Sequence, residues 1–212
     1  RWGQVSVNEP PSRAVMNLKQ GSDLHVLAIG VSRYADSNYD LEVADKDAQS
    51  FAAAFRDRPA ELFRKVYVHE LVNEDATRDG ILRALGELEQ AVTQNDLAII
   101  SFAGHGISDV HQDFFFLPHD YDSSKEIATT AISWDEARRS LGHMACLVVL
   151  VMDSCQSGAI TRSGMRGLPE LEMKTATAKA LSRFAQSEKG AVVMAASLAN
   201  QNAQERNTWG HG

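Results

Sequence analysis

The 212 residues are 44% hydrophobic, enough for one well-buried core and no requirement for a second domain. The 28 acidic side chains outnumber the 21 basic ones, so the chain is a poor electrostatic match for nucleic acid or an anionic membrane surface. No apolar run reaches the length of a membrane span, and Cys146 and Cys155 form no disulfide or metal-binding pattern. These totals predict a globular protein in a reducing, cytoplasmic compartment.

The N-terminal part of the chain differs from the rest. Residues 1–23 are polar and contain Pro10-Pro11, which predicts a linker from an upstream segment and a domain that begins at Leu24. From there, short apolar runs alternate with amphipathic segments. The apolar runs predict five strands buried on both faces, at 25–31, 65–72, 97–103, 145–152 and 190–197.

Helices are predicted between these strands. Apolar residues fall on one helical face at 44–55, 76–92 and 133–144, and the last stretch has the Ser133 and Glu136 spacing of a capping box. The alternation predicts an α/β fold with a mostly parallel central sheet and helices on both faces. Residues 114–118 predict a short extra strand or hairpin arm. The connection 159–189 is long, and connections of this length are often functional.

Two predicted strands end in reactive side chains. The strand 97–103 runs into Gly104-His105-Gly106, and the strand 145–152 runs into Asp153-Ser154-Cys155. In open parallel sheets ligands bind beyond the carboxyl ends of the strands, so both groups are expected at one edge. A thiol is a good nucleophile only as thiolate, and a neighbouring imidazole holds that state near neutral pH. The sequence therefore predicts His105 and Cys155 as a catalytic pair, with the N–H groups of Gly106 and Cys155 as oxyanion donors.

Each of these residues alone also has a structural interpretation. Free cysteines are often buried, as we expect for Cys146, and histidines near sheet edges are often only hydrogen-bonded. The other histidines show no metal-ligand spacing, so no metal or other cofactor is predicted. Asp120 and Asp122 leave a calcium site open, although solvated loop carboxylates are the commoner explanation.

The motifs AGHG and DSCQSG resemble those of the caspase-like cysteine peptidases, in which the histidine lies about 50 residues before the cysteine. DSCxSG is most similar to metacaspases and bacterial caspase-like proteins. The resemblance covers residues 24–212 and implies a caspase-like three-layer sandwich. It also implies a large-subunit region to about residue 158, a processing loop over about 159–189 and a small-subunit region from 190.

The resemblance implies a function as well. Cys155 would be the nucleophile of an endopeptidase that acts on a protein or peptide substrate, and His105 would assist its attack and protonate the leaving amine. Self-cleavage in the segment 159–189 would activate the enzyme. Domains of this kind are often fused to sensor modules, so a fused or bound regulatory domain is expected.

Two acidic residues bear on specificity. Asp153, at the second strand end, and Asp47, in the first turn of the first predicted helix, resemble the acidic pocket residues of metacaspases. A pocket that selects one charge sign needs the opposite charge at its base, because a buried unpaired charge is costly. Animal caspases instead have an arginine in the loop before that helix, where this chain has Leu41. Cleavage after Arg or Lys is therefore implied, with a helix-dipole role for Asp47 and a turn-forming role for Asp153 as alternatives.

Other functions stay open. The domain could be a catalytically idle caspase-like interaction module, or a caspase-like peptidase with non-basic specificity. A small-molecule hydrolase or a flavodoxin-like binder would also suit such a sheet. The segment after the first strand, GVSRYADSNYD, is neither a GxGxxG nor a Walker sequence, which disfavours a flavin or nucleotide site.

Overall fold

The computed structural model of the chain describes residues 21–56, 62–109, 111, 113–153 and 191–195. Among these residues, five parallel strands form the central sheet in the order β2-β1-β3-β7-β8. They are β1 (Asp23–Gly30), β2 (Lys65–Val72), β3 (Leu97–Ala103), β7 (Leu147–Asp153) and β8 (Ala191–Ala195). The predicted parallel α/β sheet is confirmed, and the bounds of β2 and β3 are as predicted, while those of the other three strands differ by one or two residues.

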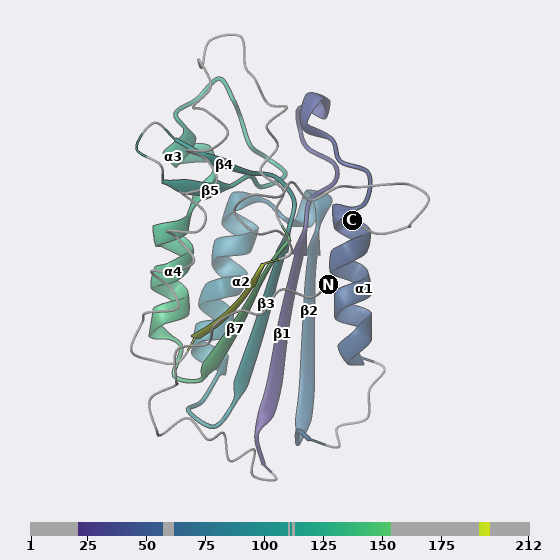
Figure 1. The fold of residues 1–212 in the computed structure, drawn as a ribbon, viewed down its shortest axis with the longest axis vertical. Helices are drawn as coiled ribbons and strands as arrows, with labels where there is room; N and C mark the ends of the chain where they lie inside the picture. The colour runs from purple at the N-terminus through teal and green to yellow at the C-terminus, as the bar shows by residue number, and fades with distance from the viewer. Residues whose placement is uncertain (1–20, 57–61, 110, 112, 154–190, 196–212) are drawn as a thin grey trace, which may run out of the picture.

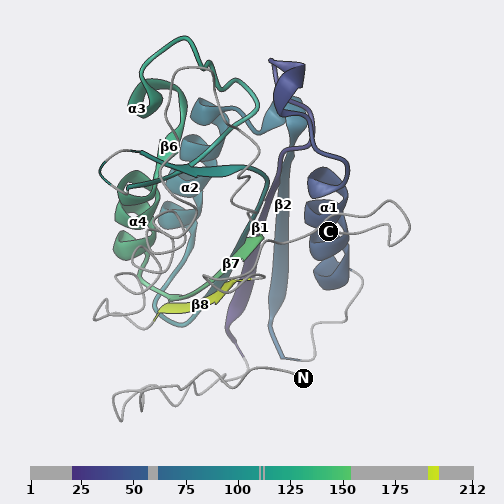
Figure 2. The same cartoon turned by 45° about the horizontal axis from the view of Figure 1, so that its top comes forward.

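Helices cover both faces of this sheet, which gives three layers (Figures 1 and 2). Helix α1 (Ala44–Arg56) packs against β1 and β2 on one face, whereas α2 (Arg78–Ala91) and α4 (Trp134–His143) lie on the other. The predicted capping box is confirmed at α4, because the Ser133 hydroxyl accepts from the Glu136 N–H and the Glu136 carboxylate accepts from the Ser133 N–H. The connection 159–189 lies outside the described residues.

A small antiparallel sheet lies above the carboxyl ends of the main strands (Figure 1). It consists of β4 (Gly106–Ser108), β5 (Phe114–Phe116) and β6 (Ile132–Ser133), with β5 in the middle. The predicted hairpin arm at 114–118 is therefore confirmed. Strand β6 was not predicted, because two residues directly before a helix are too short for an apolar pattern. The one-turn helix α3 (Ile127–Thr130) precedes β6.

The prediction that every strand is buried on both faces is wrong for β8, in which Val192 and Met194 are exposed, and for β2. Its side chains alternate, and Lys65, Tyr67 and His69 are exposed while Leu71 is buried. In the described sheet β2 is an edge strand, which α1 covers on one face only. An edge position leaves the second face to water, so apolar and polar residues alternate.

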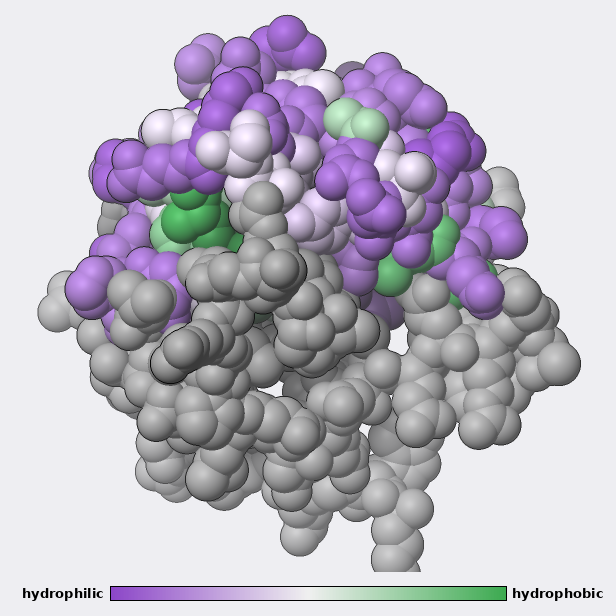
Figure 3. All heavy atoms as spheres, turned by 90° about the horizontal axis from the view of Figure 1, so that it is seen from above, coloured by the Kyte–Doolittle hydropathy of each residue, from purple (hydrophilic) through white to green (hydrophobic). Residues whose placement is uncertain are grey.

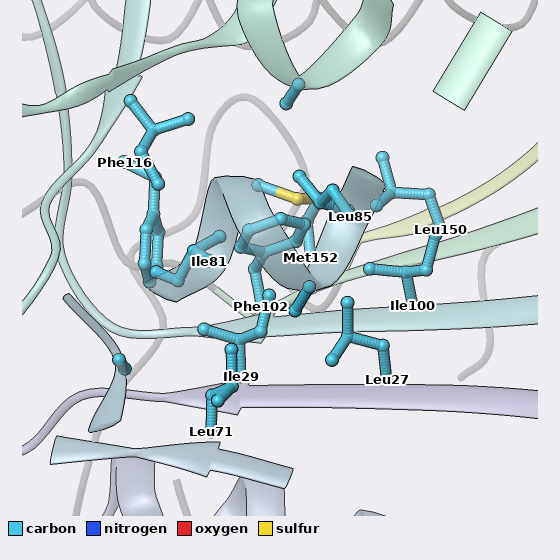
Figure 4. Packing of buried hydrophobic residues seen from close by; sticks show 14 of the residues in the cluster. Leu27, Ile29, Leu71, Ile81, Leu85, Ile100, Phe102, Phe116, Leu150 and Met152 are labelled. Atoms are coloured by element: carbon cyan, nitrogen blue, oxygen red, sulfur yellow. The ribbon is translucent and has the colours of Figure 1, made fainter. Parts of the chain in front are cut away.

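The core lies between the sheet and the pair α2 and α4 (Figure 4). Ile29, Ile100 and Leu150 project from β1, β3 and β7 towards Ile81 and Leu85 of α2, and all five side chains are fully buried. This core holds the strands rigidly, so the residues that follow their carboxyl ends start from fixed positions. No helix in the described ranges is both long and apolar enough to cross a bilayer.

Gly30 sets how closely α1 approaches the sheet. A Cβ atom at Gly30 would lie 2.5 Å from the Ala44 carbonyl oxygen and 2.6 Å from the Ala48 Cβ. Neither of these atoms belongs to the end of a flexible side chain, so α1 would have to shift. We expect Gly30→Ala to lower the free energy of unfolding by about 3 kcal/mol, as overpacking of a rigid core does.

The matched control is Gly86→Ala within α2, where a Cβ atom would meet nothing within 4 Å. Alanine has the higher helix propensity, so this variant should be more stable by about 0.5–1 kcal/mol. Urea unfolding of both variants measures the difference. Equal stability of the two would show that the contact between α1 and β1 adapts to the extra methyl group.

Candidate active site

The two strand ends predicted to meet are neighbours in the sheet. Ala103, the last residue of β3, pairs with Asp153, the last residue of β7, and the Gly104 N–H lies 3.4 Å from the Asp153 carbonyl oxygen, which accepts from it. His105 and Asp153 therefore belong to one edge, as expected. Cys155 and its N–H group lie outside the described residues.

Gly104 makes the turn that brings His105 back over the sheet. Its φ of +147° is rarely adopted by residues with a side chain, and a Cβ atom there would lie 3.2 Å from the Tyr34 hydroxyl oxygen and 3.3 Å from the Phe116 ring. The first glycine of the Gly-His-Gly motif is thus required by backbone conformation. The sequence alone places Gly104 after a predicted strand and does not indicate this conformation.

Among the described residues, Tyr34, Leu117 and Tyr39 hold His105, which is 5% exposed, by hydrogen bonds. Its backbone N–H donates to the Tyr34 hydroxyl oxygen at 3.0 Å, and its carbonyl oxygen accepts from the Leu117 N–H at 2.9 Å. In the ring, Nε2 lies 2.8 Å from the carbonyl oxygen of Tyr39. A carbonyl oxygen can only accept, so this contact assigns the proton to Nε2 and makes Nδ1 the basic nitrogen of the neutral ring.

The surroundings of His105 favour that neutral ring. Burial lowers the pKa of His105, although the hydrogen bond to the Tyr39 carbonyl acts in the opposite direction. The rings of Tyr34 and Tyr39 lie with their centroids 5.3 and 6.4 Å from that of His105. A buried, oriented and neutral imidazole is what a base for a nearby thiol requires.

Gly106, the first predicted oxyanion donor, directly follows His105 and begins β4. It is buried and pairs with Phe116 of β5. Its position next to the imidazole is fixed by the small sheet, while its use as an oxyanion donor stays a prediction.

The two predicted specificity residues approach each other on the α1 face. Burial raises the pKa of Asp153, and the negative charge of Asp47 raises it further. Asp47 lies in the first turn of α1, and its N–H donates to the Val43 carbonyl oxygen. Ser101, two residues before Ala103 on this face of β3, has a buried hydroxyl without a hydrogen-bond partner among the described residues. The use of Asp47 and Asp153 as a specificity pocket stays a prediction.

The model of one protein family, the caspase domain, matches residues 24–211. The chain belongs to the caspase domain family. Membership of this family implies cysteine peptidase activity on a protein substrate. No curated protein matches.

Two solved structures resemble this caspase domain. A Geobacter sulfurreducens protein is 21% identical with a TM-score of 0.58, and the match covers 89% of this chain and 76% of that one. The pro form of sf-caspase-1 is 12% identical with a TM-score of 0.39, and the match covers 77% of this chain and 60% of that one. The first likeness supports the fold.

The acidic loop left open as a calcium site has its carboxylates engaged within the caspase domain. Asp120 accepts from the Arg78 N–H, and Asp122 accepts from the N–H and hydroxyl of Ser124 and pairs with Lys125. These donors lower the pKa of Asp122 to about 2. In the part of the chain that the structure describes, no three His, Cys, Asp or Glu side chains are grouped to hold a metal ion.

The two tyrosines that hold His105 were not predicted from the sequence. Tyr39 contributes its backbone carbonyl, which every residue has, so no residue type in the sequence marks it. Tyr34 contributes a hydroxyl, but the spacing of 71 residues to His105 gives no local signal. Both lie in the β1–α1 loop of the caspase domain.

Cys146 is confirmed as a core residue. It is buried, and burial raises the pKa of its thiol to about 11. At pH 8 a thiol with that pKa is thiolate in about one molecule in a thousand, so Cys146 is a poor nucleophile.

Proposed function

We propose that this caspase domain is a cysteine endopeptidase in which Cys155 and His105 form the catalytic dyad. The observation that carries the proposal is the fixed ring of His105. Its Nε2 is occupied by the Tyr39 carbonyl, so Nδ1 is the nitrogen for proton exchange, at the edge where β7 leads towards Cys155.

The proposed reaction passes through an acyl-enzyme. The Cys155 proton moves to Nδ1 of His105, and the thiolate forms a bond to the substrate carbonyl carbon while the N–H groups of Gly106 and Cys155 stabilise the oxyanion. His105 then gives that proton to the leaving amine as the C–N bond breaks. Water, with its proton taken up by His105, attacks the thioester and releases the new carboxyl terminus and the Cys155 thiol.

The proposed specificity is cleavage after Arg or Lys. Asp153 and Asp47 support it, because burial and the charge of Asp47 raise the pKa of Asp153 and a bound cationic side chain would offset both. Seen from above, the described surface at this edge is mostly hydrophilic, which suits a charged substrate side chain (Figure 3).

We also propose that the enzyme matures by self-cleavage within residues 159–189 and works as part of a larger sensor or effector protein. That segment offers Arg162, Arg166, Lys174, Lys179 and Arg183 as cleavage positions. Intact-mass measurement should find cleaved wild type and uncleaved Cys155→Ala. An uncleaved chain in both proteins would rule out this route.

Alkylation with iodoacetamide tests the dyad directly. We expect Cys155 to react at least 100-fold faster than Cys146 in the folded protein at pH 7.5, because an imidazole-assisted thiol forms thiolate and a core thiol does not. Peptide mass spectrometry of the quenched reaction gives both rates.

The control is the same measurement on His105→Ala, in which the Cys155 rate should fall and the Cys146 rate should stay unchanged. If both cysteines of the wild type reacted at the same rate, Cys155 would not be an activated nucleophile.

A further inference from the structure

His105 depends on the β1–α1 loop for two of its hydrogen bonds. Tyr34 supplies the hydroxyl that accepts from its backbone N–H, and Tyr39 supplies the carbonyl that fixes its ring. The position of the imidazole is therefore only as well defined as the position of this loop. What holds the loop is a separate set of residues.

Asn73 holds the start of the loop. It lies directly after β2 and is 3% exposed. Its side-chain oxygen accepts from the Ser32 N–H at 2.9 Å and from the Arg33 N–H at 2.8 Å, immediately before Tyr34. Both acceptor positions of the amide oxygen are thus used. The φ of Asn73 is +49°, a left-handed conformation that asparagine tolerates better than most residues with a side chain.

Asp45 links Asn73 and Ser32 to the helix α1, and we call these three residues the clamp. The Asn73 amide nitrogen donates to Asp45 Oδ2 at 3.0 Å, and the Ser32 hydroxyl lies 2.8 Å from Asp45 Oδ1 and accepts from the Asp45 N–H. Burial alone would raise the pKa of Asp45, but its hydrogen bonds with Asn73, Ser32 and the Lys46 N–H hold it below the ordinary value. The Asp45 carboxylate is therefore charged, and both of its oxygens accept hydrogen bonds.

Ser32 connects both tyrosines to the rest of this clamp. Its N–H is bound by Asn73, its hydroxyl by Asp45, and its carbonyl oxygen accepts from the Leu41 N–H at 2.8 Å, two residues after Tyr39. One residue thus fixes the entry to the loop and its exit.

We propose that Asn73 and Asp45 are positioning residues for catalysis, which hold the β1–α1 loop so that Tyr34 and Tyr39 orient His105. The proposal rests on the proposed dyad. We assign neither residue a contact with the substrate or the reacting atoms, and both act through the loop. Misplacement of a catalytic group by about 1 Å can cost about 100-fold in rate.

The first test is Asn73→Gly, because glycine keeps the left-handed backbone and removes only the side chain. We expect kcat for a peptide substrate to fall by about 100-fold, with KM changed by less than about threefold, since the substrate pocket is not touched. Asn95→Gly, in an exposed turn before β3, is the matched control and should keep the wild-type kcat.

The second test exchanges the two partners. Asn73→Asp alone would set a carboxylate oxygen against Asp45 Oδ2, so kcat should fall as in Asn73→Gly. Combined with Asp45→Asn, the donor and the acceptor change places and the net charge is preserved. We expect the double variant to recover kcat to within about tenfold of the wild type, which a role in stability alone would not predict.

The third readout does not depend on peptidase activity. The proton NMR signal of the His105 ring, assigned from its absence in His105→Ala, reports the pKa of that ring. In Asn73→Gly the pKa of His105 should rise towards its ordinary value, because the two tyrosines that bury it move away. If the wild type cleaves no peptide, the proposed function fails while this titration still tests the clamp. Unchanged titration and unchanged kcat in folded Asn73→Gly, or no recovery in the folded double variant, would overturn the proposal.

Discussion

Replacement of His105 by alanine is expected to lower kcat for peptide cleavage by about 10³-fold or more, the upper range for loss of a general acid and base. The effect is large because one imidazole serves twice: it takes the proton of Cys155 and returns it to the leaving amine. Steady-state rates with a fluorogenic peptide, at substrate concentrations above KM, measure it.

The control variant is His69→Ala, since His69 is an exposed histidine of β2. It should keep the wild-type rate, and urea unfolding should find both variants folded. A folded His105→Ala enzyme with a kcat within tenfold of the wild type would mean that another group activates Cys155.

Replacement of Asp153 by asparagine is expected to lower kcat/KM for a peptide with arginine before the scissile bond by about 100-fold. Removal of one partner from a partly buried charge pair typically costs 2–5 kcal/mol, and about 3 kcal/mol corresponds to that factor. A peptide with an uncharged residue at this position should be cleaved at the wild-type rate. Asp135→Asn, at the exposed start of α4, is the matched control. An unchanged arginine preference in Asp153→Asn would place the specificity pocket elsewhere.

The same substitution is expected to stabilise the fold at neutral pH. Burial and the charge of Asp47 raise the pKa of Asp153, so the folded state holds this proton more tightly than the unfolded chain does. The free energy of unfolding therefore falls as pH rises from the pKa of Asp153 in the unfolded chain, near 3.8, through its raised pKa in the folded state. Above the folded-state pKa, the charged Asp153 destabilises the fold by the full amount. Asp153→Asn removes that cost.

Urea unfolding between pH 4 and pH 8 measures this linkage. The free energy of unfolding of Asp153→Asn should exceed that of the wild type at pH 8, and the difference should shrink as pH falls. A difference that is constant with pH, or a less stable variant at pH 8, would contradict the assignment. A residue that weakens the fold where it is charged is typical of a functional site.

The central layout could be predicted from the sequence because it depends on local patterns. Apolar runs and helical periodicity predicted β1, β3 and α2 to within a few residues, and the ends of β3 and β7 are neighbours as parallel pairing requires. The exposed face of β2 was not predicted. It follows from the position of β2 at the edge of the described sheet, and the apolar pattern within one strand does not predict the order of the strands.

The contacts around His105 could not be predicted for a different reason. They join residues 66 and 71 positions apart, and one of them uses a backbone carbonyl. The clamp of Asn73 on Ser32 likewise spans 41 positions. Such pairs become visible only when the strands and the loops between them are placed in space. The oxyanion donors and Cys155 stay predictions, since Cys155 lies outside the described residues.

The most direct measurement uses two fluorogenic peptides that differ only in the residue before the scissile bond, arginine in one and aspartate in the other, with wild type and Cys155→Ala. A Cys155-dependent peptidase with an acidic pocket should cleave the arginine peptide at least about 100-fold faster than the aspartate peptide, and Cys155→Ala should cleave neither. Efficient cleavage after aspartate would contradict the proposed pocket. Cleavage by Cys155→Ala, or none by the wild type, would contradict the proposed nucleophile.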